Sequence, residues 1–575
     1  MKKIIDFEKL GKIICNGITY ESRYIREEIE KIKYIISQNG ATSKAIGIAI
    51  PRTEKLVIVI LAMLEYGIPF LLLDMHLPEK RLDYMIRNSC IKKIITIRSC
   101  IKNVIKDIEY IILDEIDILD VQNTILEEKE ENEIAYIIYT SGTTGNPKGV
   151  QVTRTGLINF ILGISEAISF EEESVIICLS SVTFDIFFLE TVFAMIKGFT
   201  VVMVPENEYS NPAKIKELIL EHNVNTIQMT PSRMKWFQLY DPTLSFLSGV
   251  KVIMIGGEIF PQSLLEILQN NTNAQIYNMY GPTETTIWST ISDLTHAKKV
   301  DIGQPIKDTQ IYILDENLCE VEDGKEGEIY IAGKGVASGY INDEEQTNAR
   351  FLIMGKEISN KIYKTGDIGK YENGKLLCLG RNDNQVKCRG YRIELDEIDY
   401  RLTAMKDVKY VVTHCQKNEE KEELIVFYVA DKMVECEKFI AFLNNYLPEY
   451  MIPLRYIRVP FLEYTESGKV DKRRMEEKYL INKEKQKKHV MFEEDGITPK
   501  VIQIVEKILS RSVGDELDRE FDCFGMDSIS FIKIVVQVEE TFNFEFETEK
   551  LTQYNFYTIR DFIHYVHSRI RRYKD

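Results

Sequence analysis

Hydrophobic positions in the first part of the chain follow two alternating periods. Residues 22–38 carry isoleucine at every third or fourth position, the spacing that places apolar side chains on one face of an amphipathic helix. Residues 45–50, 93–97 and 134–139 are short apolar runs rich in isoleucine, typical of buried strands. Helical and strand patterns in alternation predict an α/β layer.

Glycine and polar residues directly follow three of the predicted strands. Later strand patterns lie at 175–179, 200–204, 226–229, 250–255 and 275–280, and helical patterns at 156–168 and 215–222. Clusters of glycine and polar residues occupy positions 140–149, 256–258 and 281–286. Each cluster alone is equally well explained as an ordinary turn. Because open α/β sheets bind ligands at the ends of their strands, the three clusters together favour one binding site.

The rest of the chain changes character twice. Residues 301–380 are rich in strand patterns, with turns at Asp323-Gly324 and Asn373-Gly374, which predicts a small β-barrel subdomain. The next hundred residues or so predict a small α/β unit, and a lysine-rich polar linker follows at 482–488. Residues 498–574 carry apolar side chains at helical spacing, so they predict a separate helical unit.

Composition narrows the classes of function. A chain of 575 residues holds roughly three to four domain-sized units. The net charge of −17 argues against a general nucleic-acid binder; otherwise it indicates only solubility. The ten cysteines include no CxxC pair and no metal-ligand spacing, which predicts reduced thiols and a cytoplasmic location.

Two apolar stretches near the start are poor membrane segments. The first contains Asp6 and Glu8, which a secretory signal would lack. The second, residues 56–73, is interrupted by Glu65, Gly67 and Pro69. A helix followed by a strand in a soluble core explains it better than a membrane span, so we expect no membrane partner.

The cluster after the strand at 134–139 has the chemistry of a phosphate-binding loop. It reads YTSGTTGNPKGV, and its functional candidates are Thr140, Ser141, Gly142, Thr143, Thr144, Gly145 and Lys148. Glycines let the backbone approach a ligand closely, while hydroxyls, backbone N–H groups and a lysine bind phosphate oxygens. The spacing differs from the Walker pattern. The alternative, a flexible surface loop, rarely combines these residues directly after a core strand.

A series of motifs makes the chain similar to a known family. In chain order they are LPEKRLDYM (77–85), YTSGTTGNPKGV (139–150), FDIFFLE (184–190), YGPTETT (280–286), GEIYIAGKGVASGY (327–340), YKTGD (363–367), GRNDNQVKCRGYRIEL (380–395), LPEYMIP (447–453) and SGKVDK (467–472). With them the chain resembles the adenylate-forming enzymes, and within these the adenylation domains of non-ribosomal peptide synthetases. The tail, FDCFGMDSIS (521–530), resembles a peptidyl carrier domain.

The resemblance implies a fold and a division into domains. The fold class is α/β: a large adenylate-forming core of several subdomains, a small α+β subdomain after a hinge, and an all-α carrier domain of four helices. The expected bounds are 1–382 for the core, 383–480 for the small subdomain, 481–497 for a linker and 498–575 for the carrier.

The resemblance also implies roles in binding ATP. Glu284 would be the Mg²⁺ ligand, because a carboxylate suits a hard cation. Thr283 would touch the α-phosphate, and Gly257 and Tyr280 would lie near the nucleotide. Asp367 would accept the ribose hydroxyls, helped by Arg381. The residues expected to be catalytic are Lys469, Thr283 and Glu284.

Lys469 is expected to be mobile. By resemblance, the small subdomain rotates about Asp383 between two poses, one delivering Lys469 for adenylation and the other presenting residues 384–399 and opening a tunnel for a thiol. Without the resemblance, Lys469 would be interpreted as a solvated lysine in a turn. Asp396 stands where the family usually has glycine, and the sequence alone gives no reason for it.

A substrate pocket can be aligned position by position with the family. Asp185 matches the carboxylate that binds the α-amino group of an amino acid, because a buried carboxylate needs a cation; its alternative role is a helix N-cap. The other expected pocket residues are Ile186, Leu189, Gln228, Met254, Gly256, Met279, Ile287 and Trp288. With Asp185 and Lys469 they spell D-I-L-Q-M-G-M-I-W-K, close to the family's glycine-type pattern. Bulky side chains would leave little room beyond the α-carbon, although flexible methionines leave alanine possible.

Ser528 matches the serine that receives 4′-phosphopantetheine. It lies at the predicted start of a helix, a favourable place for a phosphodiester; a plain helix cap is the alternative. The implied function is ATP-dependent activation of glycine and its transfer to the chain's own carrier. Implied partners are a phosphopantetheinyl transferase and a condensation or tailoring enzyme acting in trans, with this chain as a monomer. The alternatives are an acyl-CoA ligase that uses free CoA and a non-catalytic scaffold.

Overall fold

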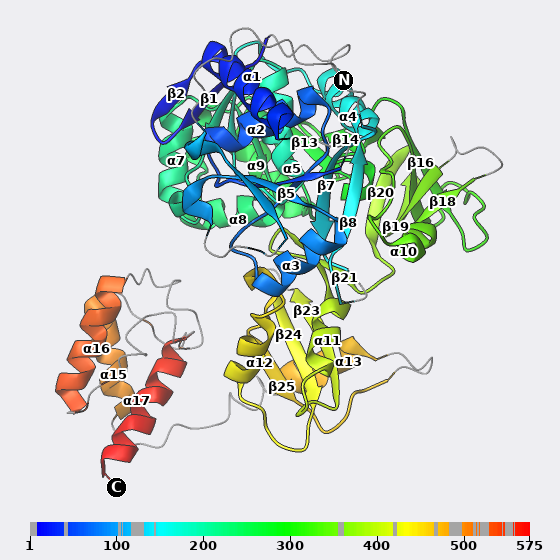
Figure 1. Ribbon diagram of the computed structural model, residues 1–575. Helices are drawn as coiled ribbons and strands as arrows, with labels where there is room; N and C mark the ends of the chain where they lie inside the picture. Colours follow the sequence, from blue (N-terminus) through cyan, green and yellow to red (C-terminus); the bar gives the residue numbers. More distant parts are fainter. Residues whose placement is uncertain are drawn as a thin grey trace. The chain divides into compact units, whose positions relative to one another are not determined.

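A computed structural model describes most of the chain (Figure 1). The described residues are 9–39, 44–101, 105, 107–116, 132–142, 145–354, 361–417, 422–464, 470–481, 497–509, 513, 517, 528–542, 544, 546, 556 and 558–574. The chain divides into two compact units, Met1–Met475 and Glu476–Asp575. No helix within the described ranges is long and apolar enough to cross a membrane.

The first sheet of the large unit carries the predicted phosphate loop. Within the described residues its order is β6-β5-β3-β4-β7-β8. The strands are β3 (Ile46–Ala49), β4 (Phe70–Leu72), β5 (Lys93–Thr96), β6 (Glu109–Ile112), β7 (Ile134–Thr140) and β8 (Lys148–Thr153). All pairs are parallel except β7 with β8. The loop at 141–147 therefore joins an antiparallel pair at the end of a buried strand.

The helices beside this sheet confirm the predicted periodicity. Helix α1 (Ser22–Gln38) buries the isoleucine face seen in the sequence. Helix α2 (Glu54–Tyr66) is buried along almost its whole length and ends at Gly67, whose φ of 89° is left-handed, a conformation that glycine adopts without a Cβ penalty. Helix α3 (Glu79–Asn88) follows, and α4 (Arg154–Ala167) begins after Thr153, whose side chain accepts a hydrogen bond from the Gly156 N–H.

A second, larger sheet holds the other strand-end clusters. Its order among the described residues is β15-β14-β13-β12-β11-β9-β10-β1-β2. The strands are β1 (Lys12–Cys15), β2 (Ile18–Tyr20), β9 (Val175–Cys178), β10 (Thr200–Met203), β11 (Thr226–Met229), β12 (Val252–Gly256), β13 (Gln275–Tyr280), β14 (Thr290–Asp293) and β15 (Gln304–Pro305). Its helices include α7 (Pro212–Glu221), α8 (Pro231–Tyr240) and α9 (Gln262–Asn271). Strands β9 to β13 are parallel to their neighbours in the centre, so their carboxyl ends share one edge.

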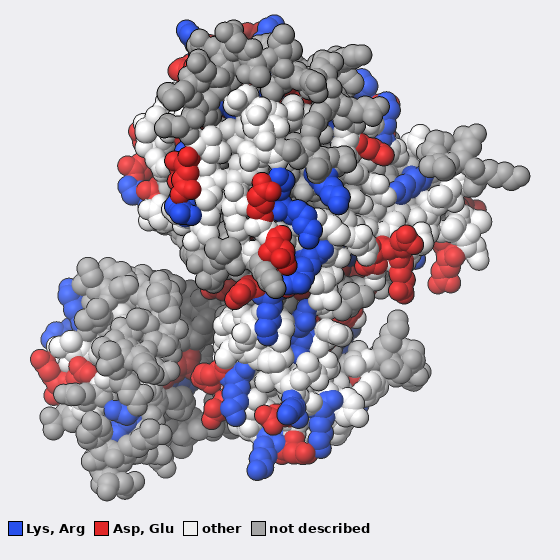
Figure 2. All heavy atoms as spheres, in the orientation of Figure 1, with Lys and Arg blue, Asp and Glu red and all other residues white. Residues whose placement is uncertain are grey.

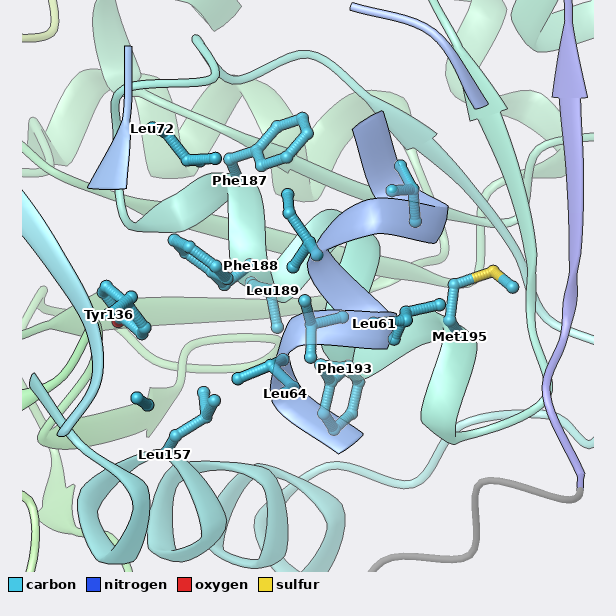
Figure 3. Close-up of a cluster of buried hydrophobic side chains, with 14 of the residues drawn as sticks. Leu61, Leu64, Leu72, Tyr136, Leu157, Phe187, Phe188, Leu189, Phe193 and Met195 are labelled. Carbon is cyan, nitrogen blue, oxygen red and sulfur yellow. The ribbon is translucent and has the colours of Figure 1, made fainter. Parts of the chain in front are cut away.

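The largest hydrophobic core joins the two sheets. It includes side chains of α2, α4, β7 and the helical segment made of α5 (Ile186–Phe188), a π-helix (Leu189–Phe193) and α6 (Ala194–Ile196). Figure 3 shows Tyr136, Phe188 and Leu64 of this cluster. The Tyr136 and Phe188 rings stack with centroids 4.2 Å apart. This packing fixes the segment that carries Asp185.

The strand-rich region differs from its prediction. Its strands are β16 (Thr309–Leu314), β17 (Gly327–Gly333), β18 (Phe351–Ile353), β19 (Lys361–Glu372) and β20 (Lys375–Arg381), with α10 (Glu344–Arg350) before β18. The long strand β19 pairs with β17, β18 and β20, all antiparallel. Within the described part of the chain this sheet does not close on itself, so the expected β-barrel is wrong. Strand alternation alone does not show whether a sheet closes.

The small subdomain begins after β20. A hairpin of β21 (Gln385–Cys388) and β22 (Tyr391–Glu394) leads into α11 (Leu395–Thr403). A separate sheet follows, with order β23-β24-β25. The remaining elements of the subdomain are β23 (Tyr410–Lys417), β24 (Glu422–Val429), α12 (Cys436–Leu443), β25 (Arg455–Arg458) and α13 (Lys472–Glu476). These elements pack around their own hydrophobic core, which agrees with the predicted α+β unit.

The second compact unit is helical. Three α-helices lie within its described residues after position 481, α15 (Ile497–Leu509), α16 (Ser528–Phe542) and α17 (Ile559–Lys574). They share a core that includes Val505, Ile534 and Phe562. On the face of the molecule shown in Figure 2, described basic and acidic side chains are intermixed.

Candidate active site

One cavity brings together eleven of the predicted site residues. The core supplies its lining from the ends of β7 and β13 and from the segment at 183–186, and the small subdomain supplies the hairpin β21–β22. The lining residues named by the sequence are Thr140, Ser141, Asp185, Ile186, Gly257, Tyr280, Thr283, Ile287, Trp288, Asp367 and Arg381. The three strand-end clusters therefore do meet, as the sequence predicts.

Asp367 lies at one end of this cavity, on β19. The Tyr280 hydroxyl donates to Asp367 Oδ2 over 2.7 Å, and Arg381 donates to Asp367 Oδ1 over 2.8 Å. Arg381 also binds both carboxylate oxygens of Asp383, at 2.7 and 2.8 Å. One guanidinium thus joins the predicted ribose carboxylate to the predicted hinge residue.

Glu284 is fully buried and ionised. Arg392 donates to its Oε2 over 2.7 Å and to its Oε1 over 3.1 Å, and the Tyr340 hydroxyl donates to Oε1 over 2.8 Å. Burial alone would raise the pKa of the Glu284 carboxyl, but Arg392 and Lys148 hold it well below its usual range. Both oxygens have partners in this arrangement, so a metal ion that binds this carboxylate would compete with Arg392 for it.

The hairpin and α11 cover the phosphate loop. The Ser141 hydroxyl donates to the Arg392 carbonyl over 3.0 Å and accepts from the Glu394 N–H over 3.2 Å. The Gly142 N–H donates to Glu397 Oε2 over 3.2 Å. Lys148 Nζ lies 3.6 Å from Glu394 Oε1. Loop groups suited to phosphate thus bind the small subdomain.

Two further arginines hold this contact. Arg81 of α3 donates to Glu397 Oε1 over 2.7 Å, and the side chains are 6% and 0% exposed. Arg401 of α11 binds the Gly145 carbonyl and, over 2.8 Å, Asn146 Oδ1. Thr140 Oγ1 is buried and has no hydrogen-bond partner within the described residues. Thr143 and Thr144, also predicted for this loop, lie outside the described residues.

Asp185 provides negative charge on the core side of the cavity. Its side chain makes no helix-capping hydrogen bond, so the N-cap alternative is not supported. Burial raises the pKa of the Asp185 carboxyl to about 6, although a hydrogen bond from Thr283 opposes the shift. A buried carboxylate with a raised pKa is stabilised by any cation that enters the cavity.

Of the other predicted pocket residues, Ile186, Ile287 and Trp288 line the same cavity as Asp185. Gln228, Met254, Gly256 and Met279 lie on β11, β12 and β13 in register, Gln228 beside Met254 and Gly256 beside Met279. A Cβ added to Gly256 would lie 2.6 Å from the Trp288 ring, so the indole packs directly against this glycine. Leu189, Gln228, Met254 and Gly256 are absent from the cavity lining, and Met279 lines an adjoining cavity beyond Tyr280.

Comparison with known proteins identifies the class. The family described as AMP-binding enzyme matches residues 27–341, more than half of the chain, and the phosphopantetheine attachment site matches residues 499–566. The chain belongs to the AMP-binding enzyme family. It is an adenylate-forming ligase of the kind found in non-ribosomal peptide synthetases, which uses ATP with Mg²⁺, and its second unit is a carrier domain for 4′-phosphopantetheine.

This AMP-binding enzyme spans only part of the length of several of its relatives. A dimodular nonribosomal peptide synthase of Bacillus subtilis (strain 168) is 32% identical over 475 residues, which are 80% of this chain and 20% of that protein. A four-domain nonribosomal peptide synthetase solved with AMP and glycine is 26% identical, with a TM-score of 0.61 over 99% of this chain and 42% of that one. A holo protein with adenylation and carrier domains, PA1221, is 21% identical and shares the fold, with a TM-score of 0.73 over 99% and 98%.

The side chains of two residues central to the AMP-binding enzyme's predicted chemistry are not described by the structure. Lys469 lies outside the described residues. Ser528 is the first residue of α16, as predicted, but its side chain is not described. Their roles stay predictions.

Sequence reasoning missed several residues of the cavity and its support. Arg392, Glu397 and Tyr340 contact Glu284 or the loop, yet the sequence assigns them no role. A signal was present: charged residues cluster in the motif at 380–395, which continues directly into Glu397. Their partners are more than fifty residues away in sequence, and no local pattern identifies them.

Proposed function

We propose that this chain activates glycine as glycyl-AMP, releases pyrophosphate and loads the glycyl group onto its own carrier domain at Ser528. The observation that carries the proposal is Asp185, a buried carboxylate at the cavity whose raised pKa favours a cationic partner. The α-ammonium of an amino acid is such a partner. Aryl and fatty acids have no cation to offer.

The size of the pocket supports glycine. Trp288 packs against Gly256, and Ile287 and Ile186 line the space next to Asp185. Steric overlap with a filled wall discriminates strongly against a larger side chain. This discrimination is stronger than the discrimination against a side chain that lacks one methylene group. Alanine is the second candidate, because a single methyl group requires the smallest adjustment.

The nucleotide is assigned to the other end of the cavity. Asp367 would exchange its bonds to Tyr280 and Arg381 for ribose hydroxyls. The phosphates would lie by the loop at 140–148, beside Thr283. Bound Mg²⁺ would neutralise phosphate charge, and Glu284 has the hard oxygen ligands for it. Lys469, delivered by rotation of the small subdomain about Asp383, would stabilise the charge that develops as the carboxylate attacks.

The observed arrangement corresponds to the second pose, in which residues 384–399 face the cavity. Arg392 and Glu397 hold the hairpin and α11 against Glu284 and the loop. When attached to the carrier, phosphopantetheine supplies the thiol that accepts the glycyl group. This chain's residues orient the adenylate and exclude water while that transfer takes place.

A second cavity is our candidate entry for the acceptor. It reaches Tyr391, and its lining residues include Arg52, Asp74, His76 and Glu206. The His76 ring lies 3.1 Å from Asp74 and 3.4 Å from Glu206. Two carboxylates at this surface repel the phosphates of a nucleotide, whereas an uncharged pantetheine arm is unaffected.

The loaded glycine would pass to another protein. We assign the chain to non-ribosomal peptide or related natural-product assembly, such as antibiotic biosynthesis, with a phosphopantetheinyl transferase and a condensation or tailoring enzyme acting in trans. A monomeric, cytoplasmic protein fits this role.

ATP–pyrophosphate exchange with each of the twenty amino acids tests the substrate. We expect one strong signal, for glycine. A larger preferred amino acid would contradict the pocket assignment, and no signal would contradict amino-acid activation. Lys469→Ala should abolish exchange. Ser528→Ala should leave exchange intact and abolish loading, so covalent loading of that variant would refute the carrier site.

A further inference from the structure

Asp396 occupies a special place beside the hinge. It is the second residue of α11 and is half-buried. Its Oδ1 accepts a hydrogen bond from Asn384 Nδ2 over 3.1 Å. Asn384 directly follows Asp383, the predicted hinge residue. A glycine at position 396, as the family pattern has, would leave this amide group without that acceptor.

The other end of Asn384 is held by a lysine. Lys472 Nζ donates to Asn384 Oδ1 over 3.1 Å. Burial lowers the pKa of Lys472, and the nearby carboxylates of Asp399 and Asp396 oppose that shift. Asp399 is itself fixed by the Thr413 hydroxyl, 2.6 Å away. The ammonium therefore lies between an amide oxygen and two acidic side chains, a favourable environment for a partly buried cation.

Lys472 is anchored to the segment that carries the predicted catalytic lysine. It is the first residue of α13. Tyr464 and Val470 form an antiparallel bridge, and the Asp471 N–H donates to the Glu463 carbonyl over 2.9 Å. The two ends of the segment 465–469, which itself lies outside the described residues, are thus held together. Lys469 is three positions before Lys472 in sequence.

We propose that Asp396 is a positioning residue for adenylation: through Asn384 and Lys472 it fixes the base of the segment carrying Lys469 to the residue beside the hinge. This inference rests on the proposed function, because it needs Lys469 and Asp383 in their assigned roles. All three linked residues follow Asp383, so they move as one body when the small subdomain rotates. A displacement of about 1 Å can slow a reaction markedly, so a looser base slows the step that uses Lys469.

The test uses the full-length holo chain and the two half-reactions. Asp396→Gly should lower kcat for ATP–pyrophosphate exchange by about fivefold, the effect of one hydrogen bond, with KM for the amino acid and ATP unchanged. Asp396→Asn keeps an acceptor oxygen and should recover most of the rate. Lys472→Met should lose a similar factor, and the double variant should lose no more than either single one, because the two residues act in one linkage.

The second readout is single-turnover loading of the carrier from synthetic aminoacyl adenylate, followed by intact-protein mass. Loading should fall much less than exchange in Asp396→Gly, because loading does not use Lys469. The matched control is Glu437→Gly, at the second residue of α12 and exposed, which also removes an acid and helix propensity from a first turn. It should leave both half-reactions unchanged.

Three results would overturn the inference: exchange in Asp396→Gly equal to the unchanged chain, an equal loss in both half-reactions, or an equal loss in Glu437→Gly. The measurements use whichever amino acid gives the strongest exchange in the unchanged chain. A wrong glycine assignment therefore appears as exchange with another amino acid in the unchanged chain. A wrong positioning role appears in the ratio of the exchange rates of the variants to that of the unchanged chain. If no amino acid supports exchange, the proposed function fails and the inference fails with it.

Discussion

The two walls of the cavity are built by different physical means. The wall around Asp185 comes from the core and consists of packed side chains such as Ile287 and Trp288, 1% and 2% exposed. The opposite wall comes from the small subdomain and is held by Arg392 and Glu397 through ion pairs and hydrogen bonds. A packed wall keeps its shape, whereas polar contacts can be exchanged for others. We therefore propose that substrate choice depends on the first wall and the order of the half-reactions on the second.

The buried Arg392–Glu284 pair illustrates the advantage of a polar wall. Removing two charges from water costs almost as much as their attraction returns, so the net contribution of the pair to holding the wall is small. Removing one partner is much more costly, because the other charge stays buried alone. Such a contact suits a surface that must dock and release, provided that each charge finds a new partner after release.

The largest effect is expected when the charge of the packed wall, that of Asp185, is removed. Asp185→Asn removes the partner of the substrate ammonium and should lower kcat/KM for glycine by about two to three orders of magnitude, because a buried charge without its partner costs several kcal/mol. ATP–pyrophosphate exchange measures it. Thermal unfolding should show a fold at least as stable, since the wild-type carboxylate is disfavoured by burial. An unchanged kcat/KM would remove Asp185 from the substrate site.

A smaller effect is expected when the polar wall is broken. Arg392→Ala should slow carrier loading by about tenfold to a hundredfold, the range for hydrogen bonds to a charged group, because the docked pose loses its bond to Glu284. Pyrophosphate exchange should change much less, since adenylation uses the other pose. Arg389→Ala is the control: it lies on the same hairpin, is exposed and binds the Glu422 carbonyl. Equal losses in both half-reactions of Arg392→Ala would contradict the separation of the two walls.

The difference between the walls also explains what the sequence could predict. Packed elements have local signatures, so the isoleucine face of α1 and the strand-end clusters were identified correctly. Asp185 and Trp288 were placed at one pocket by the resemblance to the family and not by a local pattern. Contacts of the polar wall join residues far apart in sequence, such as Arg81 and Glu397, 316 positions apart. No periodicity identifies such a pair. Closure of the sheet β16–β20 was mispredicted for a similar reason, because it depends on pairing between strands rather than on alternation within them.

A third variant sharpens the role of packing in the first wall. Trp288→Leu makes room next to Gly256, so the kcat/KM for alanine relative to glycine should rise by about tenfold, the lower range for one methyl group. Exchange with the two amino acids measures the ratio. Trp236→Leu, in the other tryptophan of the chain, is the control and should leave the ratio unchanged. If both variants shift it equally, general loosening rather than the pocket explains the change.

The smallest expected effect is a pH dependence that belongs to the packed wall alone. Burial raises the pKa of the Asp185 carboxyl to about 6. A hydrogen bond from Thr283 opposes this rise, and the nearby charge of Glu284 adds to it. The ammonium of glycine binds the ionised carboxylate, so kcat/KM for glycine should rise with pH through this value and fall by about half between pH 7.5 and pH 6. Loading from synthetic adenylate in a single turnover should lack this step, because the amino acid is already bound. The residual exchange of Asp185→Asn should lose this pH dependence. If the variant keeps the pH dependence, a group other than Asp185 titrates and the assignment to the packed wall is wrong.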